Sequence, residues 1–166
     1  MTDTSGNGGG AAPEGAPTLN ALAQYTKDFS FENPNAPRSL GVQETPPNIA
    51  IQVNVDAKQL SPSDFEVSLA LDATAGEGAD LLFKLELNYA GVFRLMNIPN
   101  EQIHPIVMIE CPRLLFPFVR QIVGDATRNG GFPPLYIDPI DFLALYHQKA
   151  AQAQAQAGGA PSVTAN

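Results

Sequence analysis

His104 and Cys111 are the two side chains of the sequence that most directly suggest catalytic chemistry. They stand seven residues apart in a stretch whose apolar residues have helical spacing, so they share a helical face and could act as base and nucleophile. A catalytic histidine also needs a third polar group to orient its ring, and we find none suitably placed. Because an apolar stripe readily accommodates a lone cysteine, we predict no catalytic residues.

Motifs for metals and nucleotides are also absent from the sequence. Its two histidines and single cysteine lack the paired spacing of metal ligands. The glycine-rich stretches GEGADL and NGGG are not followed by the Lys-Ser or Lys-Thr of a phosphate-binding loop. Most carboxylates fall at strand positions that face water, where a solvated surface is the simpler explanation. We therefore expect a protein that is not an enzyme and that uses no metal or cofactor.

The elements that carry these residues begin with segments of alternating apolar and polar character, which is typical of strands with one buried and one wet face. Four such segments occur, at residues 25–32, 49–57, 65–75 and 83–93. In the first segment the predicted apolar side holds Tyr25, Phe29 and Phe31. Short turn-like stretches join the last three segments, which favours antiparallel neighbours.

The second half of the chain changes to helical spacing over residues 101–131 and stops at a Gly-Gly pair. Pro112 and Pro117 cannot donate backbone hydrogen bonds, so we predict a break or a kink in this helix. A last helix follows, with Asp138 as its N-cap and a proline at its first position. The predicted class is α+β, with a four-stranded antiparallel sheet, one exposed polar face, a long kinked helix and a C-terminal helix.

The two ends of the chain differ from this middle part in composition. Residues 1–22 are rich in Gly, Ala, Pro and Ser. Such a segment buries too little apolar surface to offset the conformational entropy that it would lose on folding. Two glycines and a proline also stop the Ala- and Gln-rich end of the last helix. We expect disordered tails at residues 1–22 and 158–166, and a single domain at residues 23–157.

The charge of the chain limits the classes of partner. Its 17 Asp and Glu residues outnumber 9 Lys and Arg residues, which gives a formal net charge of −8. Nucleic acids and anionic membranes both favour clustered basic residues, so neither is an expected partner. The N-terminus lacks the basic start and apolar core of a signal peptide, and no stretch is long and apolar enough to span a membrane. We expect a soluble cytoplasmic protein without direct membrane insertion.

Two surfaces remain available for binding. Residues 25–93 contain ten acidic and four basic side chains, and an acidic sheet face would suit a basic protein partner. The second half also holds more aromatic residues than one small sheet and two helices can bury, so some should form a subunit interface or a binding groove. These residues are Phe116, Phe118, Phe132, Tyr136, Phe142 and Tyr146.

Four stretches of the sequence together resemble the SecB family, the protein-export chaperones of Gram-negative bacteria. They are YTKDFSFENPNAP, FKLELNYAGVF, CPRLLFPFVRQIV and GGFPPLYIDPIDFLALY, and the resemblance covers residues 25 to about 150. It implies a cytosolic homotetramer built as a dimer of dimers. It also implies an ATP-independent chaperone that holds unfolded precursor proteins and delivers them to the SecA motor ATPase.

The resemblance further implies roles for individual residues. In the family, SecA docks on the polar sheet face through acidic side chains, and the matching positions here are Asp28, Glu32 and Glu86. Lys84 stands at a position in this patch where the family has an apolar residue. Unfolded clients bind in grooves beside the crossover after the first strand and the last helix. The matching candidates are Leu40, Val42, Phe142 and Tyr146.

Two alternatives remain open from the sequence. A SecB-like chaperone of a toxin–antitoxin system would share the fold, and binding to SecA would separate it from the export chaperone. A hotdog-like acyl-thioesterase also packs a long helix against an antiparallel sheet. That enzyme would need a carboxylate or amide positioned beside the helix N-terminus, which an acyl-thioester assay would reveal.

Overall fold

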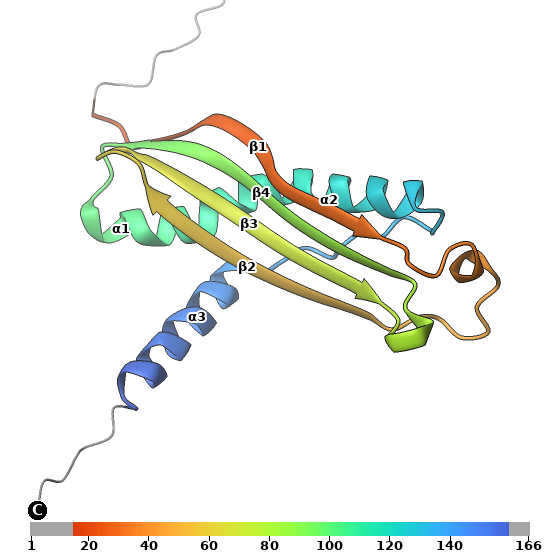
Figure 1. The fold of residues 1–166 in the computed structure, drawn as a ribbon. Helices are drawn as coiled ribbons and strands as arrows, with labels where there is room; N and C mark the ends of the chain where they lie inside the picture. Colours follow the sequence, from red (N-terminus) through yellow and green to blue (C-terminus); the bar gives the residue numbers. More distant parts are fainter. Residues whose placement is uncertain (1–14, 160–166) are drawn as a thin grey trace, which may run out of the picture.

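The computed structural model describes residues 15–159, which form an antiparallel sheet with helices on one of its faces (Figure 1). This confirms the predicted α+β class. The strands are β1 (Thr18–Glu32), β2 (Ile49–Gln59), β3 (Asp64–Ala75) and β4 (Phe83–Met96). The helical elements are η1 (Arg38–Leu40), η2 (Gly78–Asp80), α1 (Asn100–Pro105), the π-helical segment η3 (Ile106–Glu110), α2 (Cys111–Asn129) and α3 (Phe142–Ala157).

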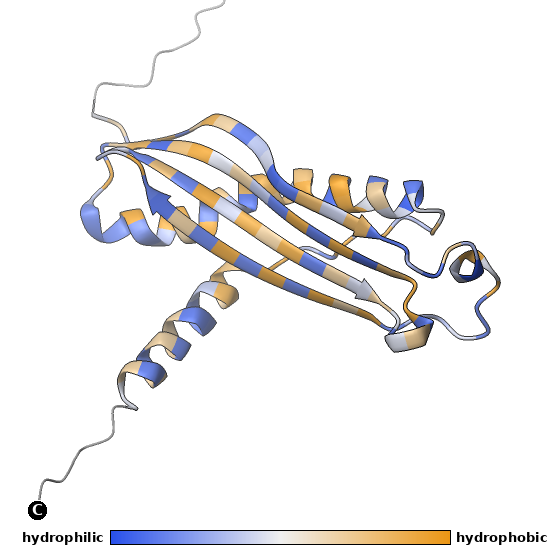
Figure 2. Ribbon diagram, in the orientation of Figure 1, coloured by the Kyte–Doolittle hydropathy of each residue, from blue (hydrophilic) through white to orange (hydrophobic). Residues whose placement is uncertain are grey.

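The four strands lie in the order β1-β4-β3-β2, and every neighbouring pair is antiparallel. Because successive side chains of a strand point to opposite faces, the sheet has an inner face toward α2 and an outer face away from it. Figure 2 shows the resulting alternation of apolar and polar residues along the strands. Leu69, Leu71, Leu85 and Leu87 are buried on the inner face. The predicted exposed polar face is the outer one.

β1 begins at Thr18, well before the predicted start at residue 25. Residues 18–21, which we expected in the N-terminal tail, pair instead with the end of β4. Backbone hydrogen bonding continues there although the side chains are small and the alternation is interrupted by an irregularity at Leu22. The first strand thus extends into the segment that we expected to be an N-terminal tail. The remaining tail predictions, for residues 1–14 and 160–166, lie outside the described residues.

A second irregularity changes the face of one aromatic residue. The pairing of β1 with β4 shifts between Thr26 and Asp28, so Lys27 is the extra residue of a bulge. Tyr25 lies opposite Ala90 and therefore points to the outer face, whereas Phe29 and Phe31 point inward as predicted. The prediction that all three aromatics share one face was wrong because a bulge reverses the alternation.

The core lies between the inner sheet face and α2. Leu115, Val119 and Val123 of α2 are four residues apart and fully buried, so they form one stripe along the helix. They belong to the same apolar cluster as Phe93 of β4, which is also fully buried. Each of these side chains contributes roughly 1.5–3 kcal/mol through removal of apolar surface from water. This packing fixes the sheet and leaves its outer face free.

The long helix is interrupted by η3, directly before α2 and its second residue, Pro112. Pro112 has no backbone N–H and cannot donate to the carbonyl one turn earlier, and a wider π turn accommodates that loss. The predicted break is therefore confirmed. At Pro117 the α-helix continues without a break.

α3 begins three residues later than predicted. Its N-cap is Asp141, whose carboxylate accepts a hydrogen bond from the backbone N–H of Ala144 at 3.0 Å. Asp138 instead lies in an extended connection, next to the buried Ile137 whose carbonyl oxygen accepts a 3.1 Å hydrogen bond from Arg120 of α2. The prediction of Asp138 as the cap was wrong because this tether to α2 keeps the chain extended.

Candidate functional site

The three predicted docking carboxylates lie together on the outer face of the sheet. Ser30 of β1 is opposite Glu86 of β4, which places Glu86 between Asp28 and Glu32 across the boundary of the two strands. All three side chains are on the face that α2 does not cover. The pairing register thus brings together residues from two strands that are far apart in the sequence.

Two further charged residues belong to this group. Asp72 of β3 lies directly opposite Glu86, and Lys84 of β4 lies opposite Glu32. The Lys84 Nζ atom is 2.7 Å from Glu86 Oε1, and nearly half of each side chain is exposed. The hydrogen bond from Lys84 to Glu86 is the main cause that raises the pKa of Lys84, and the charges of Glu32 and Asp72 add to it.

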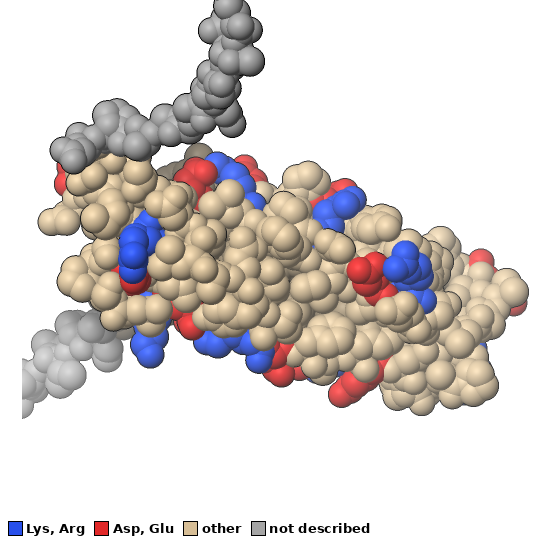
Figure 3. Space-filling view, turned by 90° about the horizontal axis from the view of Figure 1, so that it is seen from above, with Lys and Arg blue, Asp and Glu red and all other residues tan. Residues whose placement is uncertain are grey.

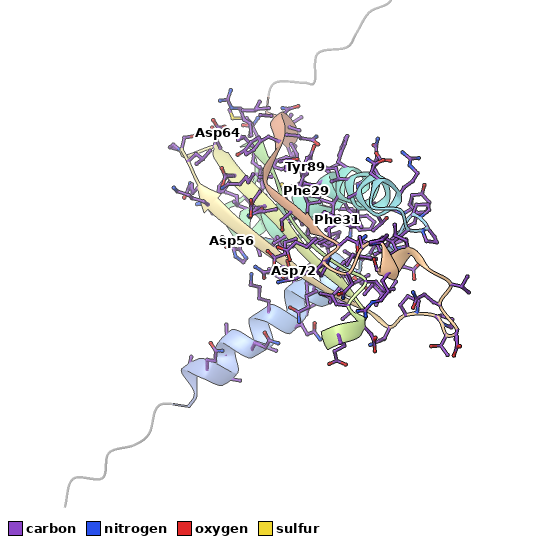
Figure 4. The ribbon with its side chains drawn as sticks, turned by 45° about the vertical axis from the view of Figure 1, so that its right-hand side comes forward. Phe29, Phe31, Asp56, Asp64, Asp72 and Tyr89 are labelled. Atoms are coloured by element: carbon purple, nitrogen blue, oxygen red, sulfur yellow. The ribbon has the colours of Figure 1, made fainter. Side chains whose placement is uncertain are left out.

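We call Asp28, Glu32, Asp72 and Glu86 the acidic cluster. Sequence reasoning included Asp72 among the acidic residues of the sheet but did not place it in the docking site. The signal that could have placed it is the short connection between β3 and β4, which fixes their hairpin register and hence the pairing of Asp72 with Glu86. Figure 4 shows Asp72 and Asp64 at different positions along the sheet.

Two other carboxylates of the outer face, Glu66 and Asp64, are neutralised by basic partners of their own. Glu66 accepts hydrogen bonds from Tyr25 Oη at 2.7 Å and from Lys27 Nζ at 2.6 Å. The hydrogen bond to Glu66, with some burial, raises the pKa of Tyr25 to about 12, while Lys27 and Tyr25 lower the pKa of Glu66. Asp64 forms a two-point ion pair with Arg94 at 2.7 and 2.8 Å, and this contact lowers its pKa.

The negative charge of the acidic cluster is less well neutralised than that of Glu66 and Asp64. Among the described residues, only Glu86 of the four carboxylates has an ion-pair partner, Lys84. Seen from above, the molecule carries acidic and basic side chains in small mixed groups with broad uncharged surface between them (Figure 3). The acidic cluster is a local group of carboxylates around Lys84 on the outer face.

The candidate client-binding residues lie in different environments. Val42 is 99% exposed and Leu40 is 47% exposed in the crossover between β1 and β2. Phe142 is only 2% exposed and packs edge-on against Phe116, so it is a core residue that no client can reach in this chain. Its assignment to the groove was wrong because an aromatic at the start of α3 serves the core and a groove equally well in sequence. Tyr146 is half-buried.

Tyr146 lines an apolar cleft between β2, the α1–η3 helical turns and α3. The cleft has a volume of about 490 Å³. Its apolar lining includes Ala57, Phe65, Ile103, Val107, Met108 and Tyr146. Leu40 and Val42 are not part of this lining, and the crossover that carries them lies at the other end of the sheet (Figure 1). The predicted groove residues are thus divided between two sites.

Polar contacts hold α3 at the wall of this cleft. Lys149 Nζ donates hydrogen bonds to the carbonyl oxygen of Val55 at 2.5 Å and to Asn54 Oδ1 at 3.2 Å. The Tyr146 hydroxyl lies 3.1 Å from His104 Nδ1. Sequence reasoning missed most of the lining because such apolar positions in strands and helices are indistinguishable from core positions.

The pair first considered for catalysis does not form an active site. Cys111 is fully buried, and this burial, with a smaller effect of Glu110, raises the pKa of its thiol to about 12. A thiol in this state is protonated at neutral pH and is a poor nucleophile. In residues 15–159 no group of three or more His, Cys, Asp or Glu side chains could hold a metal ion. No helix in this range is long and apolar enough to cross a membrane.

Comparisons with known proteins agree on one family. The family model described as preprotein translocase subunit SecB matches residues 12–153. The chain is 66% identical over 151 residues to the protein-export protein SecB of Methylocella silvestris, covering 91% of this chain and 94% of that protein. It is 57% identical over 157 residues to the protein-export protein SecB of Rhodopseudomonas palustris strain TIE-1, covering 94% and 99%.

A solved structure supports the same fold. The SecB-like chaperone of Mycobacterium tuberculosis, in complex with a peptide from the HigA1 antitoxin, aligns with a TM-score of 0.55 and 16% identity. The alignment covers 74% of this chain and 90% of that one. At this identity the likeness concerns the fold alone and does not favour the toxin–antitoxin alternative.

The sheet with its free polar face and its helical layer is thus the fold of a SecB-like chaperone. The chain belongs to the SecB family, and its role is that of a chaperone in protein export. The family predicted from the four sequence stretches is confirmed.

Proposed function

We propose that this chain holds unfolded precursor proteins in an export-competent state in the cytoplasm and passes them to SecA. It does so without ATP and without catalysing a reaction. The observation that carries the proposal is the separation of two surfaces. The acidic cluster lies on the outer sheet face, whereas the apolar cleft and its helices lie on the inner side. A client and SecA can therefore occupy the chain at the same time.

SecA docks on the outer face through Asp28, Glu32 and Glu86, with Asp72 beside them. Two observations support this assignment: these carboxylates share one face of the sheet, and Lys84 neutralises only part of their negative charge. Exposed ion pairs each contribute only about 0.2–1 kcal/mol, so the affinity comes from several of them together. Such contacts also speed the encounter with a basic partner.

Clients bind in the apolar cleft beside Tyr146 and against the exposed crossover residues Leu40 and Val42. Apolar segments are accessible in an unfolded chain and buried after folding, so a protein that binds them selects the unfolded state by mass action. The lining by Met108 suits clients of varied sequence because a methionine side chain adapts its shape. Phe142 supports this wall from the core.

The chaperone acts as a homotetramer, a dimer of dimers. β1 is an edge strand of the sheet and carries the exposed apolar residues Leu22 and Phe29. α2 presents Leu114 and Phe118 to solvent although its opposite side is buried. A single chain that exposes apolar side chains on an edge strand and a long helix is suited to assembly with copies of itself.

The holding function is tested by mixing the purified protein with a chemically unfolded precursor and following aggregation by light scattering. We expect suppression at a stoichiometric ratio of tetramer to client, to the same extent with and without ATP. A folded protein of similar size serves as a control and should not be bound. Aggregation that proceeds unchanged would contradict the proposal, and suppression that requires ATP would contradict its mechanism.

A further inference from the structure

Lys84 is a positively charged side chain that lies within the acidic cluster. It points to the outer face between strands that supply Glu32 and Asp72, and its ammonium group contacts Glu86 at 2.7 Å. Because Lys84 and Glu86 are two residues apart on one strand, their ion pair joins no two elements of the fold. Both side chains are nearly half exposed, so the pair contributes little to stability.

We propose that Lys84 is an internal counter-ion that competes with the basic segment of the docking partner for Glu86. The incoming ammonium or guanidinium group must displace the Lys84 ammonium from Glu86 Oε1. The long flexible side chain of lysine makes this displacement feasible without movement of the backbone. This inference rests on the proposed docking of SecA at the acidic cluster.

Competition of this kind sets a threshold for the partner. A segment with a single basic residue gains little, because it exchanges one cation for another at the same carboxylate. A segment with several basic residues also contacts Asp28, Glu32 or Asp72, which form no ion pair within residues 15–159. Lys84 therefore makes the docking face selective for multiply charged segments, since specificity is a difference of affinities.

The test compares Lys84→Gln with Lys58→Gln in the full-length protein. Lys58 is an exposed lysine on the outer face of β2 opposite Glu66, a carboxylate that keeps Lys27 as its partner, so both variants remove one positive charge from the same face. Binding of a peptide of ten lysines is measured by calorimetry at low salt. We expect Lys84→Gln to tighten binding about two- to fivefold and Lys58→Gln to tighten it less than about 1.5-fold.

Equal gains in the two variants, or no gain in Lys84→Gln, would overturn the inference. A weaker complex with Lys84→Gln would also overturn it, because Lys84 would then contribute to binding instead of competing. Circular dichroism and thermal unfolding of both variants verify that the fold is intact.

A second arm separates this inference from the docking proposal. The same variants are titrated with SecA, together with a variant in which Asp28, Glu32 and Glu86 are replaced by Asn, Gln and Gln. If the lysine peptide binds Lys84→Gln more tightly while SecA binds the triple variant as tightly as the parent, the docking site of SecA is wrong and the role of Lys84 stands. If SecA binding falls in the triple variant while Lys84→Gln has no effect on either titrant, the docking site stands and the role of Lys84 is wrong.

Discussion

Glu66 receives hydrogen bonds from two neighbours on β1, Tyr25 and Lys27, and the bulge at Lys27 is what makes both available on the outer face. The bond from Tyr25 requires the protonated hydroxyl, so it holds the pKa of Tyr25 above its ordinary value of 10.0, at about 12. The stabilisation is complete below the ordinary pKa and is lost as the pH rises through the pKa of the folded state.

We expect Tyr25→Phe to lower the free energy of unfolding by about 1 kcal/mol at pH 8, since one hydrogen bond is lost. The difference from the parent should shrink between about pH 10 and pH 12. Urea unfolding at pH 8 and pH 11.5 measures it. Tyr136→Phe is the control, because Tyr136 is exposed and contacts Arg120 through its ring, which the substitution retains. A loss of unfolding free energy that does not change with pH, or that is equal in Tyr136→Phe, would contradict the role of the hydrogen bond from Tyr25 to Glu66.

Phe142 and Tyr146 have different proposed roles: Phe142 packs in the core behind the cleft, whereas Tyr146 contacts the client. Phe142→Ala should lower the free energy of unfolding by about 3–5 kcal/mol, because it leaves a cavity in the core. Tyr146→Ala should retain the fold and weaken client binding severalfold, since it removes one wall of the cleft. Tyr136→Ala removes a tyrosine outside the cleft and should leave client affinity unchanged. Fluorescence titration with an unfolded client, after urea unfolding of each variant, distinguishes these outcomes. Client affinity that is unchanged in Tyr146→Ala would exclude the cleft.

The start of α3 determines one wall of the client cleft. Asp141 caps the helix, and Lys149 two turns later fastens it to the edge of β2. We expect Asp141→Ala to lower the free energy of unfolding by about 1 kcal/mol and to speed amide exchange in the first turn of α3. Asp138→Ala removes the same group from the extended connection and should change neither quantity. Equal effects of the two substitutions would show that the cap is not formed by Asp141.

β2, β3 and β4 could be predicted with their correct faces because uninterrupted alternation and short turns determine both register and burial. β1 was only partly predictable, since the irregularities at Leu22 and Lys27 leave no clear signal in a single sequence. The grouping of Asp28, Glu32 and Glu86 followed from the family resemblance and from their strand positions. The cleft could not be predicted, because Phe65 and Met108 resemble core residues until the position of α3 is known.

Assembly of the whole molecule depends on apolar side chains that a single chain leaves exposed. Replacing Leu114 and Phe118 on α2 by Glu should split the proposed tetramer into dimers, because charges would be buried at the contact between dimers. Leu143→Glu places a charge on an equally exposed apolar position of α3 and should leave the tetramer intact. Sedimentation equilibrium at micromolar concentration measures the mass. A parent protein that is monomeric would contradict the proposed assembly.

The separation of a docking face from a client side is tested most directly by SecA binding to a protein that lacks the predicted docking carboxylates. The variant carries Asp28→Asn, Glu32→Gln and Glu86→Gln, which removes three charges from one group on the outer face. A control with Glu44→Gln, Glu77→Gln and Glu101→Gln removes three exposed charges elsewhere. Three lost ion pairs of about 0.2–1 kcal/mol each correspond to a weakening of about tenfold.

Calorimetry with SecA at 0.1 M and 1 M salt measures this difference, since the Debye length falls from about 10 Å to about 3 Å over that range. We predict that the docking variant binds SecA about tenfold more weakly than the control at 0.1 M salt and that the two converge at 1 M. Its client affinity and its thermal stability should equal those of the parent. Equal SecA affinity in the docking variant and the control would contradict the assignment of the outer face and leave the acidic cluster as a solvated surface.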